Sequence, residues 1–118
     1  MAKSQQVRET YNDGFIVYGH KETLRSGTGK RVGEDFQAVG KLAYKEVSCR
    51  DNDYQMASFM SATLDIKIKT LYPPSFRGIN RSKLKVVKDG IEFDVIKVDP
   101  DREKSCLYFY LQEVGVVE

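Results

Sequence analysis

The sequence is poor in the side chains that most often carry out catalysis. It contains a single histidine, His20, two cysteines and no tryptophan. A histidine that acts as a general base needs an orienting partner and a cleft, and the sequence around His20 indicates neither. A surface or half-buried histidine on a strand is the simpler interpretation. We therefore predict that the protein is not an enzyme and that it binds no cofactor and no metal.

Cysteine pairs and long apolar runs are also missing. Cys49 and Cys106 are far apart and have no CxxC spacing, which favours two free thiols over a disulfide or a metal site. We expect Cys106 to begin a strand and to pack as a small hydrophobe. The N-terminus lacks the apolar segment of a signal peptide, and no stretch approaches the ~20 apolar residues of a membrane span. These absences predict a protein that folds in the reducing cytoplasm and has no membrane partner.

Charge of one sign is not in large excess either. The formal net charge is +2, because 19 lysines and arginines stand against 17 aspartates and glutamates. So small an excess does not indicate a nucleic-acid-binding protein, and any contact with DNA has to come from local patches. The alternative role for basic loop residues is solvated charge that keeps the loop soluble. The candidate DNA-facing or partner-facing residues, which gather in two predicted loops, are Arg25, Lys30, Arg31, Arg77 and Arg81.

Two further patterns fail to match known sites. The segment Gly27-Thr-Gly-Lys30 has too short a spacing for a phosphate loop, and arginine follows its lysine where serine or threonine is needed. The aspartate pairs Asp51/Asp53 and Asp99/Asp101 lack the central glycine and the closing glutamate of a calcium loop. We expect these carboxylates to act in helix caps and turns.

The chain does contain the apolar residues of one folded domain. With 118 residues, 41% of them hydrophobic, it can bury a single core. The polar residues 1–13 are expected to form a flexible N-terminal arm, and residues 14–118 a single domain. Alternation of apolar and polar residues predicts about six strands, at Phe15–Leu24, Phe36–Tyr44, Thr63–Tyr72, Lys83–Lys88, Ile91–Val98 and Leu107–Val114.

Local signals set the connections between these strands. Asp89-Gly90, between two alternating segments, predicts a tight hairpin because both turn residues take positive φ. Gly40 inside the alternation of the second strand predicts a bulge or a sharp bend, and the change of apolar face after Val95 predicts a bulge or a strand buried on both sides. No β-α-β rhythm is present, which favours antiparallel pairing. The fold class that follows is mainly β: a small antiparallel β-barrel or sandwich with one short helix.

The one predicted helix lies between the second and third strands, at Asp53–Ser61. Ser48, Asp51 or Asn52 can cap it. Met56, Phe59 and Met60 follow the spacing of one helical face, and we expect this stripe to pack on the core rather than to form a partner groove. In the last strand, both faces are apolar or aromatic, so one face is expected to cover the core and the other to meet a further element or another subunit.

A set of local patterns recurs along most of the chain: a strand leading into a polar helix start, an extended strand of alternating apolar and basic residues, a variable-aromatic-isoleucine hairpin and an aromatic last strand. The segments that carry these patterns are Lys41–Ser48, Arg50–Asp53, Thr63–Thr70, Lys85–Asp99 and Leu107–Val114. Through them the chain, from about Gly14 to its end, resembles the head-closure, or head–tail joining, proteins of long-tailed bacteriophages and prophages. The loop between the third and fourth strands departs from the family pattern, because it holds Pro73-Pro74 and Phe76.

The resemblance implies a structural role in the virion, at the interface between head and tail. Proteins of this family form a ring below the portal and its adaptor, retain the packaged DNA and dock the tail. The implied partners are further copies of the chain in a closed ring of about six or twelve, portal and adaptor proteins, tail terminator or tail proteins, and packaged double-stranded DNA in the channel. Assembly takes place in the cytoplasm of the bacterial host, and the free protein can be a monomer.

Two other functions fit the same sequence. A tail-completion or tail-terminator protein is also a small mixed β protein, but binds the tail tube. An oligonucleotide-binding barrel is the second alternative, and Tyr108, Phe109 and Tyr110 are aromatic residues on which bases can stack. Against this alternative, the sequence shows no basic stripe interleaved with exposed aromatic residues on one face.

Overall fold

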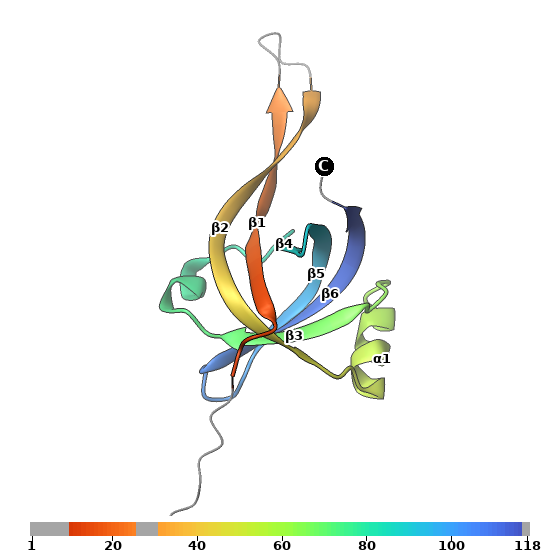
Figure 1. The fold of residues 1–118 in the computed structure, drawn as a ribbon. Coiled ribbons are helices and arrows are strands. Elements are labelled where there is room, and N and C mark those ends of the chain that lie inside the picture. Colours follow the sequence, from red (N-terminus) through yellow and green to blue (C-terminus); the bar gives the residue numbers. More distant parts are fainter. Residues whose placement is uncertain (1–9, 26–30, 117–118) are drawn as a thin grey trace, which may run out of the picture.

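The computed structural model describes the backbone of residues 10–25 and 31–116, and the side chains of this part apart from those of residues 23–25 and 31–34. Within these residues, six antiparallel strands form one closed barrel with the neighbour order β1-β2-β3-β6-β5-β4 (Figure 1). This confirms the predicted fold class, in its barrel form. The strands are β1 (Gly14–Arg25), β2 (Arg31–Val47), β3 (Ile66–Leu71), β4 (Lys85–Lys88), β5 (Ile91–Pro100) and β6 (Cys106–Val116).

Two helices accompany the strands in the part of the chain that is described. α1 (Asp51–Phe59) lies between β2 and β3, and the 3-10 helix η1 (Pro74–Gly78) follows β3. Neither is long and apolar enough to cross a membrane. The predicted arm, residues 1–13, falls largely on residues 1–9, which lie outside the described residues. Asp13, at its end, accepts a hydrogen bond from the backbone N–H of Glu46 at 2.8 Å.

Turn and bulge positions agree with the alternation of the sequence. Asp89 and Gly90 both have positive φ, 52° and 75°, as a two-residue hairpin turn of the right twist requires. The β1–β2 register shifts between Tyr18 and Gly19, so β2 contains one additional residue next to Gly40 that has no register partner on β1. The β5–β6 register shifts after Val95 in the same way. Both predicted bulges are present.

The barrel interior holds one hydrophobic cluster to which all six strands contribute. η1 adds Phe76, which is fully buried and packs edge-on against three other aromatic rings. The loop after β3 is therefore anchored inside the barrel by one side chain. The buried members of the cluster are Ile16, Tyr18, Tyr44, Ile68, Phe76, Leu84, Val86, Phe93, Leu107, Phe109 and Leu111.

A second, smaller cluster lies between α1 and the outer surface of the barrel. It consists of Ala57, Leu64 and Tyr110, with Met56 and Ile96 packed against it. The outer face of β6 therefore meets another element of the same chain. This was one of the two possibilities predicted for the second face of the last strand, the other being contact with another subunit. The second cluster joins α1 to β6 through Tyr110 and to β5 through Ile96, and these two strands lie across the barrel from β1 and β2 in the strand order. Figure 1 shows α1 at the side of the barrel, next to one end of β3.

The predicted packing of the helix stripe is wrong for two of its three residues. Met56 packs on the second cluster, but Phe59 is 94% exposed and Met60 is 53% exposed. The buried position is Ala57, whose small side chain lets the helix approach the sheet. Because successive residues are about 100° apart around a helix, Phe59 lies about 200° from Ala57 and faces outward. The N-cap is Arg50, and Asp53 accepts a hydrogen bond from its backbone N–H at 2.9 Å.

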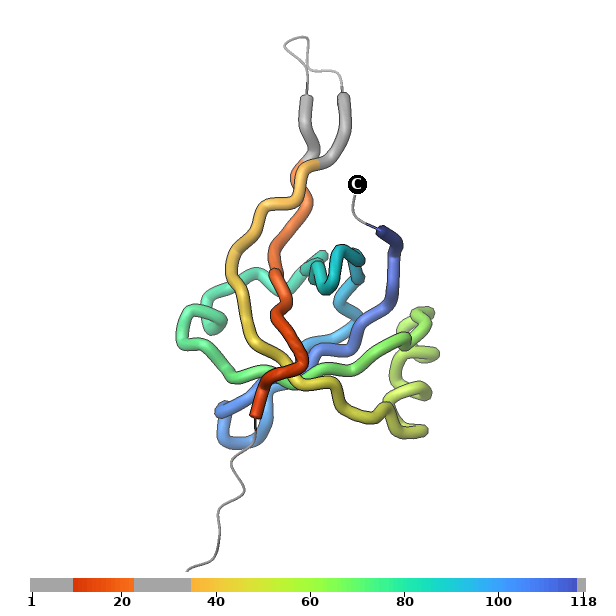
Figure 2. Tube along the Cα trace, in the orientation of Figure 1, coloured from red at the N-terminus to blue at the C-terminus, as the bar shows by residue number. Residues whose placement is uncertain are grey.

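β1 and β2 extend beyond the barrel as a two-stranded arm. On β1, only Ile16–Gly19 pair with β4, and on β2, only Tyr44–Val47 pair with β3. Beyond Gly19 the two strands pair with each other alone, as far as Arg25 and Arg31. Figure 2 shows this arm leaving the barrel at the top of the view.

Gly19 is required where the arm leaves the barrel. A Cβ at this position would lie 2.0 Å from the backbone oxygen of Gln37 on β2. We expect Gly19→Ala to lower the free energy of unfolding by about 1–3 kcal/mol, because the strand pair has to separate. Gly78→Ala is the matched control, since nothing lies within 4 Å of its Cβ position. Chemical denaturation measures both, and equal stability of the two variants would contradict the close approach.

Candidate functional surfaces

His20 has a structural partner. Its Nε2 atom is 2.7 Å from the backbone oxygen of Asn80, which joins β1 to the loop that follows η1. Among the described residues, no three His, Cys, Asp or Glu side chains gather as a group that could hold a metal ion.

The basic residues chosen from the sequence lie in two separate places. Arg25 ends β1 and Arg31 begins β2, and the two are register partners at the far end of the arm. Lys30 lies outside the described residues. Arg77 in η1 and Arg81 after it are both exposed, on the side of the barrel where the η1 loop projects (Figure 1).

The η1 loop uses one of its arginines to cover the core. The Arg81 guanidinium lies over the Phe76 ring, 5.2 Å from its centroid. Arg77 lines a shallow hollow of about 270 Å³ together with Tyr72, Pro74 and Lys104. Arg81 therefore has a packing role that follows from the position of Phe76, whatever else it contacts.

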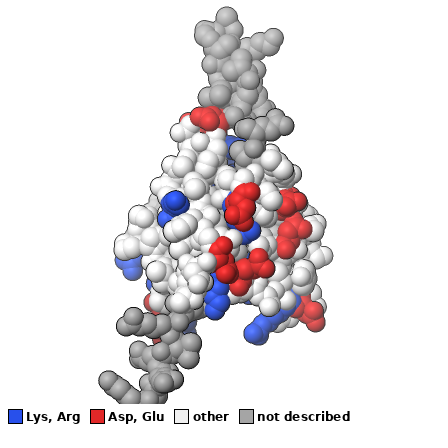
Figure 3. Space-filling model, in the orientation of Figure 1, with Lys and Arg blue, Asp and Glu red and all other residues white. Residues whose placement is uncertain are grey.

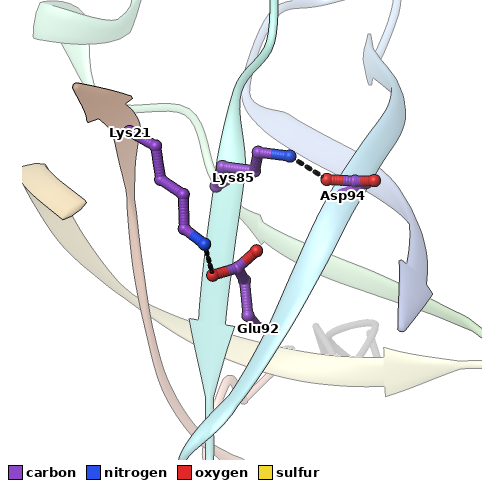
Figure 4. Close-up of polar contacts among 4 residues, drawn as sticks. All are labelled: Lys21, Lys85, Glu92 and Asp94. Carbon is purple, nitrogen blue, oxygen red and sulfur yellow. Dashed lines mark hydrogen bonds and ion pairs between the residues drawn. The ribbon is translucent and has the colours of Figure 1, made fainter. Parts of the chain in front are cut away.

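Cations near β4 and β5 are balanced by carboxylates. Lys21 Nζ lies 2.6 Å from Glu92, and Lys85 pairs with Asp94 across the β4–β5 ladder (Figure 4). Lys21, Lys85 and Asp94 border an open groove of about 590 Å³ that also reaches Lys83 and, at the end of α1, Met60. Two of the three lysines that line the groove, Lys21 and Lys85, are therefore paired with carboxylates. Figure 3 shows both acidic and basic side chains on one face of the molecule.

A basic and aromatic band crosses the outer surface of β2, β3, β6 and β5. The strand registers place its residues in two rows, each running from β2 to β5. The first row is Lys45, Lys69, Tyr108 and Asp99, and the second is Val47, Lys67, Tyr110 and Lys97. We call these eight residues, with the adjacent Arg50, the basic band.

Lysines and tyrosines contact each other within the basic band. Lys67 Nζ lies 5.2 Å from the centroid of the Tyr108 ring and 5.1 Å from that of Tyr110, and Lys69 Nζ lies 5.4 Å from Tyr108. Such cation–π contacts hold the lysine stems along the sheet. Arg50, Lys67, Lys69 and Tyr108 also line a hollow of about 450 Å³. The band is thus an ordered surface with a shallow depression.

One ion pair joins the basic band to α1. Lys67 Nζ lies 3.1 Å from Asp53 Oδ2. Burial lowers the pKa of Lys67, but the hydrogen bond to Asp53 and the neighbouring Tyr110 outweigh it, so the pKa is above its usual value. For Asp53, burial raises the pKa, but the backbone N–H of Arg50 and the ammonium of Lys67 lower it by a larger amount, so the pKa lies below its usual value. Both groups stay charged at neutral pH, and the pair fixes the start of the helix against β3.

The basic band was not predicted from the sequence, in which no basic stripe with interleaved aromatic residues was evident. Lys67 and Lys69 are two positions apart on one strand, so their side chains lie on the same face of the sheet. The same is true of Tyr108 and Tyr110 on another strand. Nothing local indicates that these strands are neighbours, because β3 pairs with β6 rather than with β4. The sequence did indicate that each pair shares one face of its strand. Only the strand order shows that the two pairs are neighbours.

Two groups of exposed apolar side chains lie on different elements, one on β1 and β2 and one on α1. The first, which we call the strand patch, is centred on Phe15 of β1, which is 60% exposed and has Lys41 Nζ 4.7 Å from its ring centroid. Val39 on β2, 55% exposed, lies four residues along the strand from Ala43, the register partner of Phe15. The second, the helix patch, is Phe59 and Met60 at the end of α1. Since α1 covers strands across the barrel from β1 and β2, the patches face different directions. Large apolar side chains this exposed indicate contact surfaces.

The turn between β5 and β6 confirms the role expected for one aspartate. Asp101 accepts hydrogen bonds from the Ser105 N–H and hydroxyl, each at 2.6 Å, and from the Cys106 N–H at 3.1 Å. The Ser105 hydroxyl, followed by the Cys106 N–H, lowers the pKa of Asp101 to about 2. Cys106 itself is buried, as predicted, and both cysteines are free thiols.

This turn predicts an acid dependence of stability. The folded pKa of Asp101 is about 2 and the ordinary value is 3.8. Its contribution is therefore complete above the ordinary value and is lost as the pH falls from there toward 2. We expect Asp101→Asn to be less stable than the parent at neutral pH. As the pH is lowered through this acid range, its melting temperature should fall less than that of the parent. Glu103→Gln is the control for losing one carboxylate from the same turn, and parallel melting curves for Asp101→Asn and the parent would contradict the expectation.

Comparison with known proteins gives the fold and no family. No protein-family model matches the sequence, and no curated protein is significantly similar to it. The structure of protein SF1141 from Shigella flexneri 2a aligns over 85% of this chain and 90% of its own, with 16% identity and a TM-score of 0.59. A chain from the virion of a native gene transfer agent particle aligns over 88% of this chain and 96% of its own, with 20% identity and a TM-score of 0.51. The three chains share a fold.

Proposed function

We propose that this chain is a structural protein of a phage-type virion and that it acts in the neck, as a head-closure protein. The observation that carries the proposal is the fold shared with a chain of the gene transfer agent virion along nearly the whole length of both. Such an agent is a phage-like particle. That neighbour supports a structural role in a virion, and the sequence resemblance to head-closure proteins supports the neck as the position within it. In this proposal the protein catalyses no reaction.

Ring formation is supported by the two apolar patches. A closed ring of identical subunits uses a heterologous contact, in which each subunit offers two different surfaces. The strand patch and the helix patch are different in composition and lie on different elements of the fold. We infer that the helix patch of one subunit packs against the strand patch of the next.

In the neck, the remaining surfaces of the protein would contact different neighbouring components. The portal and its adaptor lie on one side of such a ring and the tail on the other, with packaged DNA in the channel. The arm formed by β1 and β2 projects from the barrel and has two strand edges that pair with nothing else in the described part of the chain. Free edges of this kind pair readily with another chain. We propose that the arm contacts one of these neighbouring proteins.

Deletion of the gene from the phage or prophage that encodes it tests the neck role. After induction, electron microscopy of the lysate should show free tails beside tailless heads that have lost their DNA, because heads without closure do not retain it. Packaged heads with overlong or aberrant tails would instead assign the protein to tail completion. Intact virions would contradict a place in the neck altogether.

A further inference from the structure

Among the described residues, Glu92 is the one charged residue that is buried. It is 7% exposed, and its Oε1 atom lies 2.6 Å from Lys21 Nζ. A buried ion pair adds little net stability over apolar residues of similar size, and its best-attested use is to fix how two elements fit together. Here the two elements are β5 of the barrel and β1 of the arm. The position of Lys21 on β1 therefore decides what the pair holds in place.

Lys21 lies on the arm, beyond the barrel. The last residue of β1 that pairs with β4 is Gly19, opposite Lys85. From there on, β1 pairs with β2 alone among the described strands. The Lys21 side chain nevertheless reaches Glu92 on β5, the strand beyond β4 in the barrel order (Figure 4). The ion pair thus links the arm to the barrel after the backbone ladder has ended.

The neighbouring residue makes a second contact, to another part of the barrel. His20 Nε2 lies 2.7 Å from the backbone oxygen of Asn80, and since a carbonyl oxygen only accepts, Nε2 is the donor. Successive side chains of a strand point to opposite faces, so His20 and Lys21 hold the arm from both. The β1–β2 bulge lies directly before them, at Tyr18 and Gly19, where a strand pair bends. Both contacts therefore act across the bend.

We propose that the Lys21–Glu92 ion pair and the His20–Asn80 contact form a brace, which makes the arm leave the barrel in one fixed direction and prepares it for contact with a neighbouring protein of the virion. The contact with a neighbour rests on the proposed function, whereas the brace itself does not. An arm that is already held in place has less conformational freedom to lose on binding, which strengthens the contact. The single histidine thereby has a structural role.

Distances between spin labels on the arm and on α1 test the brace in the full-length protein. The labels are attached at Glu22→Cys on β1 and Ser58→Cys on α1, both exposed sites, with the half-buried native thiol removed by Cys49→Ser. α1 is a suitable reference because the second cluster packs it on the barrel. Pulsed electron paramagnetic resonance gives the distribution of distances between the two labels.

The variants compare two adjacent ion pairs. Glu92→Gln removes the charge of the brace and keeps the size of the side chain. Asp94→Asn is the matched control, because it removes the carboxylate of the Lys85–Asp94 pair, which joins two barrel strands (Figure 4). Lys21→Gln removes the braced pair from its more exposed side, 31% against 10%, and replaces Glu92→Gln if thermal melting shows that variant to be unfolded.

We expect Glu92→Gln to broaden the distance distribution, because the equilibrium constant for the braced direction should fall by about tenfold, the usual loss for a hydrogen bond to a charged group. His20→Ala should broaden it as well, since it removes the contact on the other face of β1. Asp94→Asn should keep the distribution of the parent. An unchanged distribution in Glu92→Gln or in His20→Ala, or equal broadening in Asp94→Asn, would overturn the brace.

Complementation separates the brace from the neck role. In cells that lack the parent gene, Glu92→Gln should restore far fewer infectious particles than Asp94→Asn. A yield equal to that of the parent, together with a broadened distribution, would refute the part of the brace in assembly and leave the neck proposal intact. Intact virions in the deletion lysate, together with a broadened distribution, would refute the neck role and support the brace as a property of the fold.

Discussion

Phe76→Ala should lower the free energy of unfolding by about 3–5 kcal/mol, the usual range for removing a buried phenylalanine. The side chain is fully buried, although it belongs to a short 3-10 helix in a loop. Its ring packs edge-on against Tyr18, Tyr72 and Phe109 at centroid distances of 5.5, 6.1 and 6.0 Å. Removal leaves a cavity in the barrel and frees the loop that Phe76 anchors.

Phe59→Ala is the matched control for this prediction, because it makes the same chemical change at a site that is 94% exposed. Its effect should be within about 0.5 kcal/mol of zero. Urea denaturation of the two variants beside the parent gives both values. A small loss for Phe76→Ala would show that the ring does not fill the barrel, and the η1 loop would then be peripheral.

Phe59→Asp and Phe15→Asp should each prevent ring formation without unfolding the protein. Each change places a charge in one of the two apolar patches, where it would be buried between subunits. We expect each to weaken the subunit contact by about 2–4 kcal/mol, or roughly 30- to 1000-fold in Kd. In cells that lack the parent gene, neither variant should restore the yield of infectious particles. Leu71→Asp, at a 58% exposed site outside both patches, is the control.

Mixing the two variants distinguishes a heterologous contact from other modes of assembly. The Phe15→Asp subunit keeps its helix patch, and the Phe59→Asp subunit keeps its strand patch. One contact can therefore form between them, and the pair cannot extend to a ring. Analytical ultracentrifugation under conditions in which the parent assembles should show a dimer only in the mixture. Assembly of either variant alone to the size of the parent would contradict the pairing of these patches.

Alternation in the sequence was enough to find the strands, because one face of each is buried in a single interior. Asp89-Gly90 identified its hairpin, since two adjacent positive φ values suit few other residue pairs. The orientation of α1 could not be predicted in this way. Its packing is decided by Ala57 and by the Asp53–Lys67 ion pair, not by its largest apolar residues.

The candidate surfaces were harder to predict, because they depend on strand order. Lys69 and Tyr108 are far apart in the sequence and become neighbours only through the β3–β6 pairing. In the sequence, Phe76 was part of a departure from the family pattern, in a basic loop. Its role became clear from its position inside the barrel. Clusters that are local in sequence, such as Arg77 and Arg81, were easy to notice for the opposite reason. Proximity along the chain indicated a group of charges but not what the charges contact.

Gold labelling of purified particles tests the central claim most directly. Antibodies against this protein would be applied to intact virions and to isolated heads and tails, and viewed by electron microscopy. A place in the neck predicts label at the junction of head and tail and at one vertex of isolated, DNA-filled heads. Particles without label, or label along the tail tube or over the whole capsid, would contradict it.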